Sequence, residues 1–316
     1  MNIFVIFAII NVVVSIVFGT LVLFSNPRRR VNQLFFLFTL SVTVWSFSYF
    51  IWQLASDASH ALFWVHILMA GAIFIPFLYF HFIVRFLNLQ HSLRAWIWIG
   101  YVLALFLSII NWTPLFVASV GVQAGFLFWP SAGVLFFPFL IIWIFYASAT
   151  ILLLIQRIKI AAVTERTQIQ YILIGTIIGY IGGCTNYFLW YGILILPYGN
   201  ITASIYIFLV AYAVMRRGLF NMKVVATELL VFMLWLFVFI RTLVATTTQE
   251  QFANGILLFV LLGAGVLLIM SVDREVKQRE LIERQAHTLE ETNARQETLI
   301  HFVSHEVKSF LTKDAN

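Results

Sequence analysis

Nine apolar runs, most of them long enough to cross a lipid bilayer, dominate the sequence. A helix rises about 1.5 Å per residue, so roughly 20 apolar residues span about 30 Å of hydrocarbon. Hydrophobic residues make up 62% of the 316 residues and charged residues only 10%, which excludes a soluble domain. The sequence therefore predicts an all-α, polytopic membrane helix bundle with crossings at residues 3–24, 34–52, 61–84, 96–112, 134–155, 171–194, 201–215, 226–244 and 252–270.

The basic residues predict the orientation of these crossings. Twelve Lys and Arg precede residue 272, and eleven of them fall on one side of the membrane if the N-terminus lies outside; the exception is Arg241. Basic residues in short loops are retained in the cytoplasm, so the pattern predicts an outside N-terminus, a cytoplasmic C-terminus and nine crossings. The formal net charge of +6 then reflects topology and does not indicate nucleic-acid binding.

The composition changes abruptly after residue 270, where Glu, Arg, Lys and Gln become frequent and no Gly or Pro follows Gly265. We expect the ninth crossing to continue as one helix for about 60 Å into the cytoplasm. Gly263 and Gly265 lie within the apolar run and predict close helix packing instead of a phosphate-binding loop. A heptad pattern predicts a parallel, homodimeric coiled coil, with a single solvated helix as the alternative. Its a positions are Ala286, Asn293, Ile300 and Val307, and its d positions are Ile282, Leu289, Gln296, Val303 and Phe310.

His305 is the candidate reactive residue on this helix. In the heptad register it occupies position f, which faces water, so another domain could reach its imidazole. A neutral imidazole is a competent nucleophile near pH 7, and the neighbouring carboxylate of Glu306 is suited to orient or accept its ring proton. Spacing alone leaves open that His305 is an ordinary surface histidine.

The residues around His305 resemble the phosphoacceptor box of bacterial sensor histidine kinases. The resemblance implies that His305 is phosphorylated and that Glu306 is its acid-base partner. It also marks Ser309 as a candidate phosphatase position, because such kinases often carry Thr or Asn there. Phe310 departs from the family, which usually has Pro at this place. The matching residues are Phe302, Ser304, His305, Glu306, Lys308, Leu311 and Thr312.

A second, broader resemblance covers roughly residues 3–220 and points to the seven-helix sensor region found in some histidine kinases. Together with the apolar runs and the heptad pattern, the two resemblances predict four segments: a seven-helix membrane sensor region at 1–224, an additional transmembrane hairpin at 225–271, a signalling coiled coil at 272–298, and the start of a dimerisation and phosphotransfer domain at 299–316. The residues that carry the resemblance are Asn26 to Asn32, Phe35, Phe36, Ala61 to Trp64, His81 and Phe82.

The family resemblance also implies the protein's partners and cofactors. These are the lipid bilayer of the bacterial inner membrane, a second copy of the chain and the receiver domain of a response regulator. ATP and Mg²⁺ would bind a catalytic domain that residues 1–316 do not include, so we expect a truncated kinase without a cofactor or metal site of its own. A transporter-like protein with a dimerising tail and a receptor scaffold without kinase activity remain the alternatives.

Polar residues inside the apolar runs are candidates for sensing a stimulus. His66 and His81 lie on the third run and Asn186 on the sixth, close to Cys184. Such residues are costly in a bilayer and often functional, but they also serve to hold helices together. The pair Gly182-Gly183 predicts a surface that another helix can approach closely.

Overall fold

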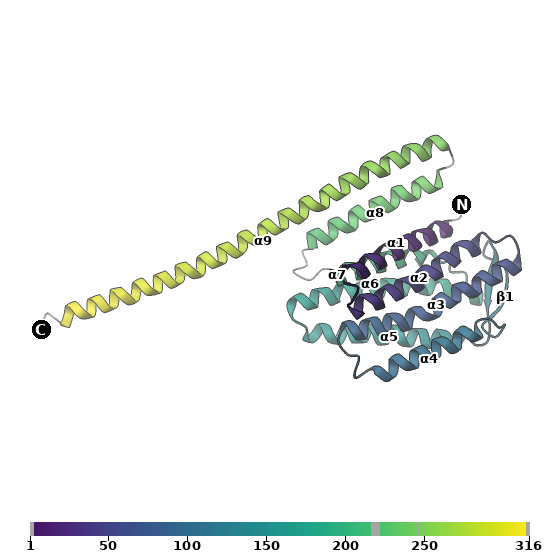
Figure 1. Cartoon of the computed structure of the whole chain (residues 1–316), viewed down its shortest axis with the longest axis horizontal. Coiled ribbons are helices and arrows are strands. Elements are labelled where there is room, and N and C mark those ends of the chain that lie inside the picture. Colours follow the sequence, from purple (N-terminus) through teal and green to yellow (C-terminus); the bar gives the residue numbers. More distant parts are fainter. Residues whose placement is uncertain (1–2, 216–221, 246, 314–316) are drawn as a thin grey trace. The chain divides into compact units, whose positions relative to one another are not determined.

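The computed structural model describes residues 3–215, 222–245 and 247–313 and divides the chain into two compact units, residues 1–220 and 221–316. All nine apolar runs are helical, as predicted. Unit 1 contains α1 to α7, and unit 2 contains α8 and α9 (Figure 1). The helices are α1 (Ile3–Ser25), α2 (Arg30–Gln53), α3 (Ala58–Phe86), α4 (Arg94–Ile110), α5 (Phe136–Ile160), α6 (Val163–Phe188), α7 (Thr202–Met215), α8 (Met222–Val244) and α9 (Thr248–Lys313).

Among the described residues, seven helical segments are long and apolar enough to cross a membrane. Five of them lie in α1, α2, α3, α5 and the first 29 residues of α9. The other two are Glu165–Tyr191, which extends just beyond α6, and Tyr198–Met215, which begins just before α7. The helix α4 and the segment Leu230–Phe239 of α8 are shorter apolar helices. The protein is thus a multi-pass membrane helix bundle, while the count of nine crossings stays a prediction.

The sixth run is shifted from its predicted position. The helix α6 begins at Val163, eight residues earlier than the apolar pattern suggested, because polar residues such as Glu165 continue the helix beyond the apolar run. It ends at Phe188 and is followed by a short 3-10 helix, η1 (Leu189–Tyr191), which Gly192 terminates in the left-handed region at φ 76°. A second 3-10 helix, η2 (Tyr198–Ile201), leads into α7.

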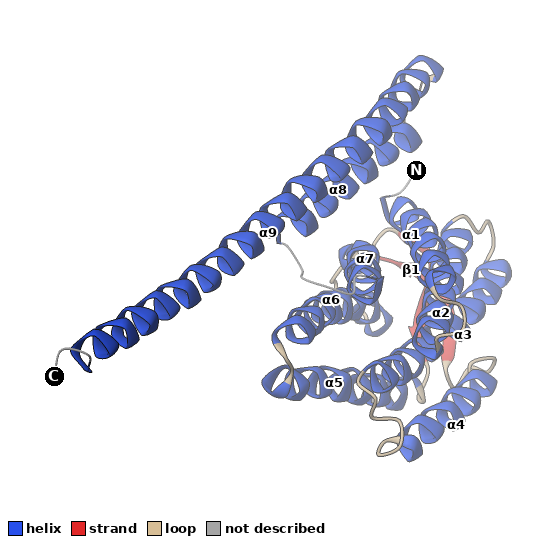
Figure 2. Cartoon of the chain, turned by 60° about the vertical axis from the view of Figure 1, so that its left-hand side comes forward, coloured by secondary structure: helices blue, strands red, loops and turns tan. Residues whose placement is uncertain are grey.

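A β-hairpin that the sequence pattern did not predict lies between α4 and α5. Its strands are β1 (Val117–Gln123) and β2 (Phe126–Ala132), which pair antiparallel at one end of unit 1 (Figures 1 and 2). Ala124 and Gly125 form the two-residue turn with φ values of 50° and 86°, the combination that tight hairpin turns require. Trp52 Nε1 donates to the carbonyl of Phe128 at 2.8 Å, which ties the hairpin to the end of α2.

The helix α7 forms part of the core of unit 1. Ten of the eleven residues of α7 from Ser204 to Val214 are buried, as expected for a helix that is apolar on all sides. The outer helices instead expose large apolar side chains, such as Ile109 on α4 (74% exposed) and Phe137 on α5 (60% exposed). Exposed apolar surfaces of this kind suit contact with lipid.

Small residues allow the closest approaches between helices of unit 1. A Cβ added at Gly71 of α3 would lie 2.7 Å from the backbone nitrogen of Trp45 and 2.9 Å from the carbonyl oxygen of Ser41, both on α2. The hydroxyl of Ser41 also donates to the carbonyl of Gly71 at 2.9 Å. The backbones of α2 and α3 therefore touch at Gly71, as small-residue interfaces in membranes permit.

Unit 2 contains one membrane hairpin and one long helix. Trp235 Nε1 on α8 donates to the carbonyl of Leu261 on α9 at 2.8 Å. A Cβ added at Gly265 would lie 2.7 Å from Cζ2 of Trp235, whereas one added at Gly263 would meet none of the described atoms within 4 Å. The predicted close packing is therefore confirmed at Gly265 and stays a prediction at Gly263.

Candidate functional site

The helix α9 carries the predicted phosphoacceptor residues. It runs without a break over 66 residues, from Thr248 to Lys313, a length of about 99 Å. The predicted continuity of the ninth crossing is therefore confirmed. His305, Glu306 and Ser309 lie on its last turns, with His305 and Ser309 at i and i+4 on one helical face. Their side chains lie outside the described residues, so their proposed roles still rest on the sequence.

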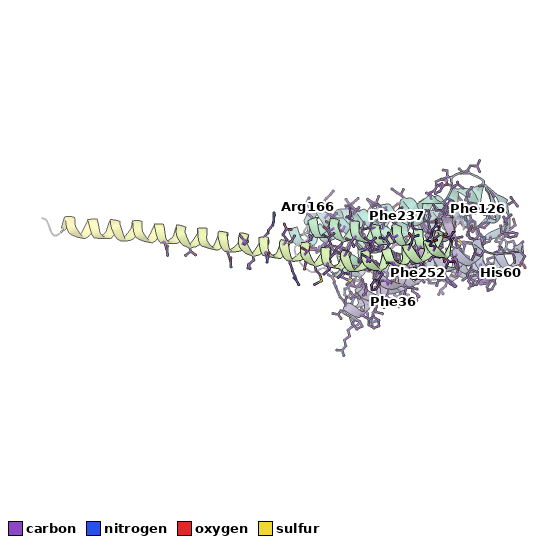
Figure 3. The ribbon with its side chains drawn as sticks, turned by 90° about the horizontal axis from the view of Figure 1, so that it is seen from above. Phe36, His60, Phe126, Arg166, Phe237 and Phe252 are labelled. Carbon is purple, nitrogen blue, oxygen red and sulfur yellow. The ribbon has the colours of Figure 1, made fainter. Side chains whose placement is uncertain are left out.

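The two ends of unit 1 differ in chemistry. Successive helices alternate in direction (Figure 1), so the basic residues that follow α1, lie in the last turns of α3 and α5, or lie near the starts of α2, α4 and α6 gather at one end. Arg166 marks this end in Figure 3, while His60 and Phe126 lie at the opposite end. At that opposite end, the Asp57 carboxylate accepts from His60 N at 2.8 Å and caps α3. This backbone hydrogen bond is the main cause of a lowered pKa of Asp57.

A buried polar cluster joins α1, α6, η2 and α7. Asn11 Nδ2 donates to the carbonyl of Asn200 at 2.8 Å, and the hydroxyl of Ser204 donates to Oδ1 of Asn11. Asn186 Nδ2 donates to Oδ1 of Asn200. These four side chains are at most 5% exposed, so the cluster fixes helices that are far apart in the sequence. The sequence identified Asn186 but missed its partners.

A cavity of about 60 Å³ lies beside this cluster. It is formed by residues of α2, α3, α5, α6, η2 and α7. Asn200 and Gly183 line it together with aromatic side chains, and no charged residue is among the described residues that line it. A smaller cavity of about 10 Å³ adjoins it, shares Trp45 and Tyr187 as lining residues, and reaches Trp129 of the hairpin. The interior of unit 1 therefore contains an uncharged, aromatic space.

Residues 7–223 match the family described as the N-terminal 7TM region of histidine kinase. The chain belongs to this family. The match extends from α1 past the end of α7, so the seven helices of unit 1 are the membrane sensor region of a histidine kinase. A histidine kinase sensor region implies a response regulator as partner and a membrane as environment. The searches of curated proteins and of solved structures each found no match.

The histidine kinase sensor region holds His66 near the hairpin end of α3. His66 is 8% exposed and its ring centroid lies 5.0 Å from that of Trp112. Its backbone carbonyl accepts from Asn111 Nδ2 at 2.7 Å, and its own Nδ1 is buried without a partner among the described residues. His66 is therefore packed against residues that follow α4, and its sensing role stays a prediction.

His81 lies nearer the opposite end of α3. Its Nδ1 is 2.8 Å from the hydroxyl of Tyr101 on α4, and the two rings meet edge to face at a centroid distance of 5.7 Å. This hydrogen bond links α3 to α4. The structure therefore does not bring His66, His81 and Asn186 into one site, because each contacts a different part of the kinase's sensor region.

The cluster contains three functional candidates that the sequence reasoning missed, namely Asn11, Asn200 and Ser204. Asn11 lies inside the first apolar run, and this position could have indicated its importance because polar residues are costly in a bilayer. Asn200 and Ser204 gave a weaker signal, since Asn200 falls between the sixth and seventh predicted runs. Gly182 packs against Gly199 and Thr202, as predicted for a close helix approach, whereas Gly183 faces open space.

Proposed function

We propose that the chain is the sensor and phosphoacceptor part of a bacterial two-component histidine kinase in the inner membrane. A stimulus acting on the seven-helix region changes the position of α9 and so controls autophosphorylation of His305. The phosphoryl group is then passed to an aspartate of a response regulator. ATP and Mg²⁺ would be held by a catalytic domain outside residues 1–316.

The main support for the proposal is the order of the segments along the chain. A seven-helix sensor region of histidine kinases is followed by α8 and then by the continuous helix α9, which carries the His305 box. A continuous helix transmits displacement or rotation because its backbone hydrogen bonds resist local deformation. The family match also favours this function over the transporter-like alternative. If His305 accepts no phosphoryl group, the alternative of a receptor scaffold without kinase activity would be favoured.

The proposed orientation places the N-terminus outside and the C-terminus in the cytoplasm. It is supported by the grouping of basic residues at one end of unit 1, since basic loops remain cytoplasmic. The proposed homodimer is supported by the heptad pattern between Ile282 and Phe310. In this arrangement His305 faces away from the partner helix and is open to a catalytic domain.

Phosphorylation of His305 is tested in membranes from cells that make the protein from its own gene. After incubation with γ-labelled ATP, we expect acid-labile and alkali-stable label on the wild-type protein. His305→Gln should lose this label completely, because the amide has no imidazole nitrogen to form the phosphoramidate bond.

His301→Gln is the matched control, since it makes the same change one helical turn earlier on α9. We expect this variant to retain the label at the wild-type level. Undiminished labelling of His305→Gln would refute the assignment of the phosphoacceptor.

A further inference from the structure

We propose that the 60 Å³ cavity in unit 1 is a binding site for a small, uncharged, apolar group, about the size of a single ring. The inference rests on the proposed sensory function, because binding at this site would be the stimulus. The site lies wholly among residues 38–206 and so within unit 1.

The size of the cavity limits the group that it can hold. A space of about 10–15 Å³ on this measure holds one water molecule. The cavity of about 60 Å³ therefore holds about four to six such groups, which corresponds to a short alkyl chain or a single ring after slight expansion. The cavity is partly open, so a longer molecule would place only one such group inside it.

The chemistry of the walls selects an uncharged and flat ligand. All fourteen described residues that line the cavity are uncharged, so a ligand ion would lose its hydration without gaining a counter-ion. Aromatic rings provide flat apolar surfaces that favour offset or edge-to-face contact with another ring. The aromatic lining residues are Phe38, Trp45, Trp143, Tyr180, Tyr187 and Tyr206.

Tyr180 contributes its ring and not its hydroxyl to the site. The residue lines the cavity and is 7% exposed, but its hydroxyl oxygen is fully buried and has no hydrogen-bond partner among the described residues. A water-sized group inside the cavity does not touch this oxygen, so Tyr180 offers a ligand the face or edge of its ring. The site therefore favours apolar occupants.

Gly183 shows that this space is open towards α6. A Cβ added there would meet no atom within 4 Å, although neighbouring Gly182 packs tightly against Thr202 and Gly199. A larger side chain at position 183 can therefore enter the cavity and compete with a ligand. Ile181 on the same helix is 67% exposed and provides a position where added bulk faces away from the core.

The location links the site to signal output. Ala203 and Tyr206 of α7 line the cavity, and α7 is the last helix of unit 1 before the chain enters unit 2. A ligand that favours one arrangement of α6 and α7 would shift the population of sensor states by its difference in affinity for them. The cavity is thus placed to influence the segment that leads towards α9.

The test uses the whole chain in lipid nanodiscs with 4-fluorotoluene as probe, followed by fluorine NMR. We expect saturable binding at one site per chain, with a resonance shifted by the aromatic walls. The anion 4-fluorobenzoate, which carries a charge on a similar ring, should show no saturable binding, because the described lining offers no counter-ion. Non-saturable partitioning of 4-fluorotoluene, as lipid alone would give, would overturn the proposal.

Two variants locate the binding. Gly183→Leu should abolish saturable binding of 4-fluorotoluene, while Ile181→Phe should leave it unchanged. Wild-type affinity in Gly183→Leu would overturn the site. Binding is measured without ATP, so its failure is distinct from a failure of His305 labelling.

Discussion

Gly71→Ala should destabilise unit 1 by about 3 kcal/mol, at the upper end of the range for an overpacked core. The added Cβ would lie 2.7 Å from the backbone nitrogen of Trp45 and 2.9 Å from the carbonyl oxygen of Ser41. Neither atom belongs to a flexible side chain, so α2 and α3 must separate. Separation also strains the hydrogen bond from the Ser41 hydroxyl to the Gly71 carbonyl. Reversible unfolding in bicelles titrated with denaturing detergent measures the change.

Gly183→Ala is the matched control for this prediction. It makes the same substitution inside a membrane helix, but its Cβ enters open space. We expect it to be neutral or to stabilise the protein by up to about 1 kcal/mol, because Ala favours helix over Gly. Equal effects of Gly71→Ala and Gly183→Ala would contradict the claim that the α2 and α3 backbones touch.

Asn11→Ala should lower the stability by about 2 kcal/mol. It removes the partner of the Asn200 carbonyl and the partner of the Ser204 hydroxyl, and both groups stay buried. An unpaired buried group costs about 1–3 kcal/mol, although hydrogen bonds measured between membrane helices average about 0.6 kcal/mol. A double-mutant cycle of Asn11→Ala with Ser204→Ala should give a coupling of about 1 kcal/mol.

Ser46→Ala is the control for the serine in this cycle. Ser46 is 1% exposed and, unlike Ser204, its hydroxyl has no hydrogen-bond partner among the described residues. Its removal should be neutral or slightly stabilising. A Ser204→Ala variant as stable as Ser46→Ala, with no coupling to Asn11, would show that the cluster does not hold α1 against α7.

The helices of this protein could be predicted because each must satisfy its own backbone hydrogen bonds in lipid. An apolar run of sufficient length therefore has few other structures open to it. The same reasoning predicted the continuity of α9, since no Gly or Pro follows Gly265. The hydropathy pattern does not indicate where a helix continues beyond its apolar residues. For this reason the predicted start of the sixth helix was eight residues later than the observed start of α6.

The hairpin was missed because it lies outside the long apolar runs, where only local turn chemistry signals structure. Ala124-Gly125 between alternating Val and Phe residues was the available sign. The polar cluster was missed for another reason. Asn11 and Ser204 are separated by 193 residues, and their hydrogen bond depends on the packing of α1 against α7. A single sequence identifies such residues as costly but does not reveal their partners.

Phosphorylation of His305 in the proposed dimer requires that α9 presents His305 away from the partner helix. Disulfide crosslinking in native membranes tests this after Cys184, the only cysteine, is replaced by Ala. In that background Val303→Cys, at heptad position d, should form crosslinked dimers readily, whereas His305→Cys, at position f, should form few. Crosslinking that is as efficient at 305 as at 303 would contradict the account.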